Sequence, residues 1–293
     1  MTVVVTGAGG LLGTALAPAL AAAGHEVRRL RQGAGPGTWD ALTGRLDAQM
    51  LVGADAVVHL AAESIAGRWS AARRRRIRES RVVGTQALAT ALSRLPTPPR
   101  VLVSASAVGW YGDRGETVLT EQAGPGRGFL AEVAEAWEAA AEPARQRGIR
   151  VVHPRLSMVL ARGGALAAML PAFRLGLGGP VGPGRQWWSW IGLDDAVGAL
   201  LWLLDHDGLC GPVNVTAPDA VACAEFARTL GRVLGRPARV PLPAWAARLV
   251  LGPMADELLL SSQRVAPERL LASGFRFTRP DLESALRHAL GRL

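Results

Sequence analysis

The chain has 293 residues, of which 49% are hydrophobic, and a formal net charge of +9, which together describe a globular protein with room for one large α/β domain and a smaller one. All 33 basic residues are arginine, so no lysine is present for a phosphate-binding loop or for Schiff-base chemistry. The 2 cysteines form no C-x-x-C pair, which argues against a zinc site or a disulfide framework, and we expect no metal.

The first predicted strand, Val3–Val5, leads directly into three regularly spaced glycines and then into an alanine-rich segment. A strand, a tight turn and a helix start at this spacing are typical of a dinucleotide-binding loop. Gly7 allows the turn, Gly10 lets the backbone approach a pyrophosphate, and Gly13 lets the helix pack closely on the strand. Because a helix start presents free N–H groups to phosphates, we expect a nucleotide there, with the helix spanning 11–23.

The second predicted strand runs from His25 to Leu30 and is followed by Arg31 and Gln32, then by a turn-rich loop over 33–37. In NAD-binding domains of this kind, an acidic residue at the strand end binds the ribose hydroxyls. An arginine suits the 2′-phosphate of NADP instead, so we expect NADP in preference to NAD. The alternative is a solvated arginine at a strand end.

Two continuous apolar runs, 55–62 and 101–106, predict buried parallel strands. Small residues end the first run, which lets a cofactor lie across the strand end. His59 lies inside this run, and we interpret it as a hydrogen-bonded core residue rather than as a catalyst. The second run ends at Ser106 and leads to Tyr111, in a loop at the carboxyl end of the strand, where the sites of α/β proteins lie.

Further along, the sequence predicts a helix over 129–145, a strand over 150–160 and a helix over 245–261. The tryptophan cluster in Trp187–Ile191 either walls a substrate pocket or packs a domain interface. Asp194-Asp195 precedes an apolar helix, and we expect one of these aspartates to cap its N-terminus.

No apolar run approaches the ~20 residues that a membrane span needs, so we expect no membrane association. The first strand begins almost at Met1, so no signal peptide is expected, and a cytoplasmic location is the default. Aromatic residues are seldom interleaved with the arginines, so nucleic-acid binding is not expected in spite of the positive charge.

Sequence motifs in a fixed order extend over nearly the whole chain. They are Thr6-Gly7-x-x-Gly10-x-x-Gly13, His59–Ile65, Arg76–Arg81 with Gly84-Thr85, Ser104–Ser106 with Tyr111–Asp113, Trp137–Ala141, Pro171–Pro180, Trp188–Ile191 with Asp194-Asp195, Gly211–Asn214 with Ala217-Pro218, and Gln263–Val265. With these motifs the chain resembles the extended short-chain dehydrogenases/reductases. It is most similar to their atypical branch of epimerase family proteins, which is related to the nucleotide-sugar epimerases.

The resemblance implies an α/β fold: a Rossmann doubly wound parallel sheet with a smaller carboxyl-terminal α/β substrate lobe. Residues 1–160 would form the NADP-binding Rossmann domain, to which 191–216 return. Residues 217–293 would form the substrate lobe, with 163–190 contributing. Many extended relatives are dimers, so a homodimer is one expectation, and the expected partner is a small-molecule substrate of unknown identity.

The resemblance also implies which residues contact NADP. They are Gly7, Gly10, Leu11, Leu12, Gly13, Arg31, Gln32, Leu60, Ala61, Arg81 and Val159. Ordinary extended members have an asparagine at the position of Arg81. A guanidinium there can hold a phosphate or a carboxylate with two hydrogen bonds.

The catalytic pair of the parent family is missing from the chain. That family uses a tyrosine as general acid or base, and a lysine four residues later lowers its pKa. Leu130 and Ala134 stand at these two positions here. The loss is independent of the alignment, because the chain contains no lysine.

Two functions of different classes remain. In the first, the protein is an NADP-dependent oxidoreductase or epimerase with a rebuilt acid–base group. Tyr111 is then the candidate acid, with Asp113 as the alternative; Ser106 lies beside Tyr111, and Arg81 or Arg155 is its electrostatic partner. In the second, the protein binds NADP without turnover and acts as a sensor or regulatory scaffold, for example in cell division.

Overall fold

The computed structural model describes residues 1–33 and 37–292, so the centre of the predicted loop over 33–37 lies outside the described residues. Its strands are β1 (Thr2–Thr6), β2 (Glu26–Gln32), β3 (Thr38–Asp40), β4 (Arg45–Leu46), β5 (Ala56–His59), β6 (Val101–Ser104), β7 (Ser106–Ala107), β8 (Val118–Leu119), β9 (Arg150–Leu156), β10 (Met158–Leu160), β11 (Trp187–Trp188), β12 (Trp190–Gly192), β13 (Gly211–Val215), β14 (Val221–Ala222) and β15 (Arg264–Val265). Its helices are α1 (Leu11–Ala22), α2 (Ala71–Ser93), α3 (Phe129–Ala139), α4 (Glu142–Gln146), α5 (Gly164–Arg174), α6 (Leu193–Asp205), α7 (Cys223–Leu234), α8 (Ala244–Leu251), α9 (Glu268–Ala272) and α10 (Leu282–Leu290).

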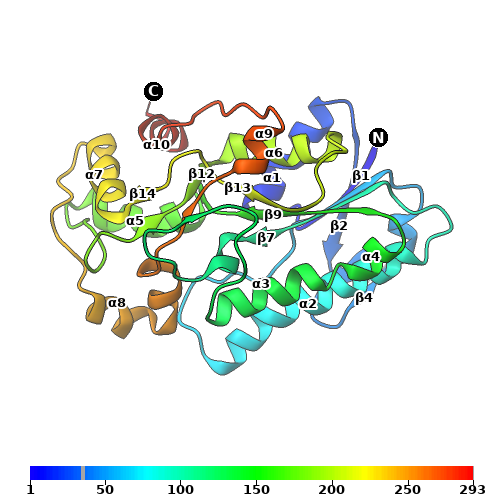
Figure 1. Ribbon diagram of the computed structural model, residues 1–293, viewed down its shortest axis with the longest axis horizontal. Coiled ribbons are helices and arrows are strands. Elements are labelled where there is room, and N and C mark those ends of the chain that lie inside the picture. Colours follow the sequence, from blue (N-terminus) through cyan, green and yellow to red (C-terminus); the bar gives the residue numbers. More distant parts are fainter. Residues whose placement is uncertain (34–36, 293) are drawn as a thin grey trace.

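A nine-stranded sheet forms the centre of the molecule, with the strand order β13-β9-β6-β5-β1-β2-β3-β4 and with β7 also paired to β9. The strands run parallel, except that β4 is antiparallel to β3. Helices α1 and α6 lie on one side of the sheet, and α2, α3 and α4 lie on the other (Figure 1). This arrangement confirms the predicted doubly wound α/β fold.

The sheet is buried on both faces because successive side chains of a strand point to opposite sides. In β1, Val3 and Val5 pack in the core that includes Leu16 of α1 and Leu200 of α6. Val4 packs in the core on the other face, with side chains of α2 and α4. The uninterrupted valine run at the start of the chain is therefore explained by burial on two sides.

A separate core lies in the carboxyl-terminal part, built mainly from α5, α7, α10 and the segment containing β11 and β12. Trp190 is 1% exposed and Trp188 is 8% exposed, and the ring of Trp188 meets Phe226 edge-on with centroids 5.4 Å apart. Trp187 is half-buried, and its indole N–H donates to Glu116 at 2.6 Å. Trp188 and Trp190 therefore pack inside this core, which differs both from a pocket wall and from the predicted domain interface.

Several predicted elements are divided in the structure. The helix predicted over 245–261 ends at Leu251, where Gly252 has a positive φ, and a separate helical segment follows at Ala255–Leu259. The predicted helix over 129–145 stops at Ala139 and resumes as α4, because Pro143 has no backbone N–H and is accommodated only in a first helical turn. The predicted strand over 150–160 breaks at Ser157, where β10 leaves the main sheet to pair with β12.

The prediction that Asp194 or Asp195 caps α6 is wrong. Gly192 is the N-cap residue, and the helix has no side-chain cap hydrogen bond. Asp195 instead accepts the backbone N–H groups of Thr278 and Arg279, at 2.7 and 3.1 Å. Its carboxylate ties the segment before α10 to the start of α6, a distant pairing that local sequence does not reveal.

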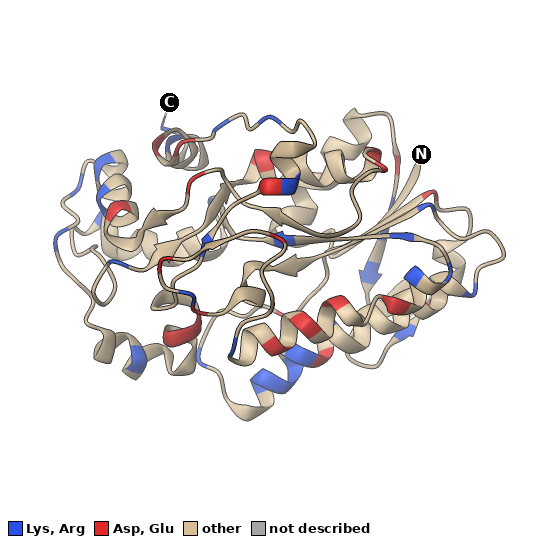
Figure 2. Ribbon diagram, in the orientation of Figure 1, with Lys and Arg blue, Asp and Glu red and all other residues tan. Residues whose placement is uncertain are grey.

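Charged residues are distributed unevenly over the helices. Arginines gather at the start of α2, beside acidic residues on α3 (Figure 2). Arg74, Arg75 and Arg76 are exposed there, as expected of a solvated helix face. In the described part of the chain, no helix combines the length and the apolar character needed to cross a membrane.

Candidate functional site

The glycine loop folds as a tight turn between β1 and α1. Gly7 has a φ of 71°, in the left-handed region that favours glycine. A Cβ on Gly13 would overlap the carbonyl oxygen of Gly7, so α1 packs directly against the turn. Gly10 caps α1 without a side-chain hydrogen bond, and the first turn contains no acidic residue. The positive end of α1 is therefore open to an anion.

The end of β5 closes on this turn. A Cβ on Gly7 would lie 2.7 Å from the Ala61 nitrogen and 2.8 Å from the Leu60 carbonyl carbon. Parallel pairing sets Thr6 of β1 opposite His59 of β5, so the carboxyl ends of both strands lie at one edge of the sheet. The structure thus brings Leu60 and Ala61 against the glycine loop.

Strand β2 is longer than predicted and includes Arg31 and Gln32. Because Thr6 pairs with Leu30, both residues extend beyond the last residue of β1, at the same edge of the sheet as the glycine loop. Arg31 is exposed and has no hydrogen-bond or ion-pair partner among the described residues. A free guanidinium at this edge suits a phosphate.

Asp47 is a residue at this edge that sequence reasoning missed. Its carboxylate accepts the backbone N–H of Gly37 at 2.7 Å and that of Gln49 at 3.1 Å. Asp47 thereby fixes the far end of the segment that follows β2. The signal that points to it is an aspartate directly before a short helical turn.

Arg81 lies on α2, close to the chain that leaves β5. Its Nη1 donates to the carbonyl oxygens of Glu63 and Ile77, each at 3.0 Å, and its guanidinium lies 5.0 Å from the ring centroid of Trp137. Burial lowers the pKa of Arg81 to about 10, and the charge of Glu63 partly opposes this shift. Arg81 is half-buried, and no carboxylate of the described chain is within ion-pair distance of its guanidinium.

The apolar residues predicted to contact NADP lie around the start of α1. Leu12 and Val159 are partly buried and pack against the core beneath α1 and α6. Leu11 is 37% exposed, and its Cδ1 would lie 3.0 Å from a Cβ on Gly163, in the loop after β10. Leu11 is thus the most exposed of the three.

Ser106 and Tyr111 belong to one buried hydrogen-bond network. Ser106 Oγ donates to Glu138 Oε1 at 2.7 Å, and Arg155 donates to both carboxylate oxygens of Glu138, at 2.8 and 2.9 Å. Arg155 also donates to the Tyr111 hydroxyl at 3.0 Å, and that hydroxyl donates to Asn214 Oδ1 at 2.7 Å. The two predicted catalytic residues are therefore joined through Glu138 and Arg155.

Tyr111 itself has no exposed surface. Burial raises the pKa of its phenol, although the charge of Arg155 opposes the shift. Its single hydroxyl proton is donated to Asn214, and Arg155 donates to its oxygen, so no proton is free to donate to a substrate oxygen. A role for Tyr111 as an acid stays a prediction, and this geometry favours Tyr111 as part of the network.

Glu138 is the residue of this network that sequence reasoning missed. Leu130, Ala134 and Glu138 follow one another at a spacing of four, so they share one face of α3. Glu138 is 8% exposed. A single acidic residue on an otherwise apolar helix face is the signal that points to it.

The start of α3 is bound by a residue from the carboxyl-terminal part of the chain. The carboxylate of Glu257 accepts the N–H groups of Phe129 at 2.8 Å and of Leu130 at 2.7 Å. These are two of the free donors at the helix start. Glu257 therefore links the carboxyl-terminal segment to the helix that carries Leu130 and Glu138.

His59 is fully buried between two hydroxyls, with Nδ1 2.7 Å from Thr6 Oγ1 and Nε2 3.0 Å from Thr85 Oγ1. Burial lowers the pKa of His59 to about 3, so the ring is neutral in the folded protein. The interpretation of His59 as a hydrogen-bonded core residue is confirmed. His153 is also buried, and burial lowers its pKa to about 4.

These histidines predict a loss of stability in acid. The unfolded chain protonates each near pH 6.5, whereas the folded chain does not, so the unfolded state binds more protons as the pH falls below 6.5. The free energy of unfolding should fall by about 1.4 kcal/mol per pH unit for each histidine, down to its folded pKa. Urea unfolding between pH 7 and 4 should show about half the wild-type slope in His59→Gln, because only His153 still contributes. An unchanged slope, or a halved slope in the half-buried control His25→Gln, contradicts the assignment.

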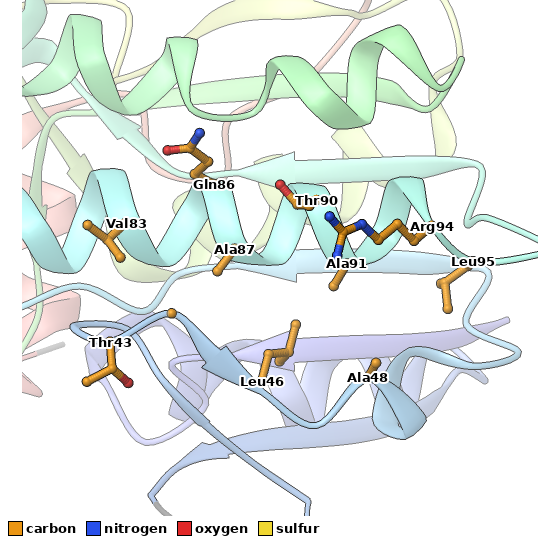
Figure 3. A pocket seen from close by; sticks show the side chains of 11 residues that line it. Thr43, Leu46, Ala48, Val83, Gln86, Ala87, Thr90, Ala91, Arg94 and Leu95 are labelled. Carbon is orange, nitrogen blue, oxygen red and sulfur yellow. The ribbon is translucent and has the colours of Figure 1, made fainter.

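Two cavities lie outside the Ser106 network. The larger, of about 580 Å³, lies between α2 and the β3–β4 hairpin (Figure 3). Its lining includes Leu46, Ala87 and Arg94, and none of the predicted site residues. The smaller, of about 310 Å³, lies between the starts of α1 and α6 and helix α10, and Leu11 lines it. The described residues contain no group of His, Cys, Asp and Glu side chains that could hold a metal.

Two family models match the chain. The NAD dependent epimerase/dehydratase family matches residues 3–215, which include the glycine loop and the Ser106 network up to Asn214. A domain of unknown function, DUF1731, matches residues 242–289, which include Glu257.

The chain is also similar to proteins over its full length. It is 41% identical to an epimerase family protein of Mycobacterium bovis, over 99% of this chain and 98% of that protein. It is 35% identical to the epimerase family protein YfhF of Bacillus subtilis, over 98% and 97% of the two chains. The crystal structure of the human epimerase family protein SDR39U1 (isoform 2) with NADPH superposes with a TM-score of 0.90 at 37% identity, covering 100% of both chains.

Proposed function

We propose that the protein is an NADP-binding oxidoreductase or epimerase that acts on a small molecule. The premise is that the chain belongs to the NAD dependent epimerase/dehydratase family and, within it, to the atypical extended short-chain dehydrogenases/reductases. One observation carries the proposal. The open N-terminus of α1 and the unpartnered Arg31 lie at the same edge of the sheet, so one ligand can present a pyrophosphate to the first and a 2′-phosphate to the second.

The residues present fit a dinucleotide. The turn at Gly7 and Gly13 would be filled by a Cβ at either position, whereas no atom lies within 4 Å of a Cβ on Gly9. The backbone is therefore closed toward the protein and open on the outside, as a pyrophosphate site requires. The human relative whose structure contains NADPH supports the choice of cofactor for this chain.

In this proposal, Gly10 and the first turn of α1 hold the pyrophosphate, and Arg31 and Gln32 hold the 2′-phosphate. Leu60, Ala61 and Arg81 line the path between the strand ends and the substrate. Val159 and the leucines at the start of α1 add apolar contacts. A bound nicotinamide dinucleotide supplies hydride transfer, and Ser106 is the proposed hydroxyl on the substrate side.

We also propose the division of labour that the resemblance implies. Residues 1–160, with 191–216, would bind the cofactor, and 217–293, with 163–190, would hold the substrate. Strand β13 joins the main sheet beside β9, and the carboxyl-terminal part has its own core. Both observations support this division.

Arg31→Met should discriminate between phosphate recognition and simple solvation. The variant should bind NADPH about 10- to 100-fold more weakly than wild type does, which is the effect of losing one to two charge-assisted hydrogen bonds. Its affinity for NADH should stay within about twofold of the wild-type value. Titration of NADPH fluorescence measures both constants. Arg29→Met, an exposed change two residues earlier on the same strand, is the matched control and should leave both unchanged. Equal loss of NADPH and NADH would contradict the proposal for Arg31.

A second function has its own supporting observation: Leu130 and Ala134 occupy the positions of the family's acid–base pair. The protein would then bind NADP without turnover, as a sensor or regulatory scaffold. A panel of carbonyl compounds and alcohols with NADPH or NADP⁺ separates the two. NADPH binding with no turnover across the panel favours the regulator, and any saturable turnover favours the enzyme.

A further inference from the structure

The network around Ser106 determines the direction of its hydrogen bonds. A serine hydroxyl has one proton to donate and two lone pairs that accept. The Glu138 carboxylate is only an acceptor, so the short 2.7 Å contact uses the proton of Ser106. Ser106 Oγ is then left with lone pairs alone for any further partner.

Arg155 keeps Glu138 in this state. It donates to both carboxylate oxygens, at 2.8 and 2.9 Å, and only 3% of its side chain is exposed. The guanidinium compensates the buried negative charge, and the ring of Trp110, 3.9 Å from its centre, covers it. In the described chain, the side-chain donors to Glu138 Oε1 are Ser106 and Arg155.

Nothing near Ser106 on α3 offers a replacement donor. In the parent family the residue at the Leu130 position donates a hydrogen bond to a carbonyl oxygen, which an aliphatic side chain does not. The Leu130 side chain also lies close to the loop after β7, because a Cβ on Gly109 would be 3.3 Å from Leu130 Cβ. A carbonyl compound would thus find no side-chain donor in Ser106 or Leu130.

We propose that Glu138 is a positioning residue that fixes Ser106 as a hydrogen-bond acceptor, so that this site binds its substrate as an alcohol, through the hydroxyl proton, in preference to a carbonyl compound. This inference rests on the proposed function in one respect, namely that Ser106 contacts the substrate. Ser106 is 2% exposed, so little of its surface can meet a substrate.

A pair of fluorinated probes tests this polarity without turnover. Trifluoroethanol donates a hydrogen bond, and 2,2,2-trifluoroethyl methyl ether, of similar shape, only accepts. Affinities are measured by fluorine NMR on the full chain, with and without NADP⁺. Wild type should bind the alcohol about fivefold more tightly than the ether, the effect of one neutral hydrogen bond.

The double variant Arg155→Met/Glu138→Leu should remove this preference, because no carboxylate is left to accept the proton of Ser106, which can then turn outward to a ligand. Glu135→Gln is the matched control, because Glu135 is exposed on the same helix, and it should keep the fivefold preference. A merely structural role for Glu138 would not change the ratio of the two affinities.

Ser106→Ala provides the second variant in case Arg155→Met/Glu138→Leu does not fold, because it leaves the Glu138–Arg155 pair intact. It should bind both probes equally. The proposal is overturned if wild type binds the two probes equally or binds neither, or if the preference persists in Ser106→Ala. If wild type does not bind NADPH, the proposed function is contradicted instead. The ratio of the two probe affinities is also measured in the cofactor-free protein, so it does not depend on NADPH binding.

Discussion

Gly13→Ala is expected to lower the free energy of unfolding by about 3 kcal/mol, at the upper end of the range for overpacking a buried position. The added Cβ would overlap the Gly7 carbonyl oxygen and would lie 2.6 Å from the Ala8 Cα. Both are backbone atoms, which cannot rotate aside, so α1 itself must shift. Because α1 presents the phosphate-binding N–H groups, NADPH affinity should fall by about 10- to 100-fold as well. Urea unfolding and NADPH titration measure the two effects.

Gly9→Ala is the matched control in the same loop. A Cβ on Gly9 meets no atom within 4 Å, and its φ is not positive, so stability should change by less than about 1 kcal/mol. Equal destabilisation by the two substitutions would show that the loop tolerates no side chain anywhere. The close contact of α1 with the turn would then not explain the destabilisation by Gly13→Ala.

Arg155→Met is expected to destabilise the protein by about 3–5 kcal/mol, as for other broken buried ion pairs. The substitution removes both hydrogen bonds to Glu138 and the donor to Tyr111, and it leaves a carboxylate that is about 10% exposed without a countercharge. Two-state urea unfolding gives the measurement.

The double variant Arg155→Met/Glu138→Leu separates charge from packing. Because it removes both charges, it should recover most of the lost stability. Arg145→Met breaks an exposed pair with Glu142, whose side chains are 50% and 44% exposed, and should cost less than about 1 kcal/mol. A loss in Arg155→Met as small as in Arg145→Met would mean that the buried pair is not a strong element of the core.

The sequence predicted the amino-terminal half well because its signals are local. A β-branched strand followed by regularly spaced glycines has few alternative folds, and Gly7 and Gly13 occupy the backbone positions that such a loop requires. Continuous apolar runs likewise identified β5 and β6, since a strand buried on both faces has no alternation. Their boundaries moved by a few residues, because strand ends depend on pairing with neighbours.

Predictions failed where a side chain had a distant partner. Asp195 stands at a helix start, where an aspartate usually caps, yet it binds the backbone at Thr278 and Arg279. The strand over 150–160 divides because β12, far along the chain, takes the second half as its partner. In both cases a long-range contact outweighed a local preference.

Local residue patterns were enough to predict a dinucleotide-binding loop, an arginine after the second strand and the loss of the family's catalytic lysine. Which side chains surround Ser106 became clear from the folded structure alone. Glu138 is 32 residues from Ser106 and 17 from Arg155, and parallel pairing of β7 with β9 under α3 is what brings the three together. Their hydrogen bonds, and thus the direction in which Ser106 can bond to a ligand, follow from packing between elements and from no local pattern.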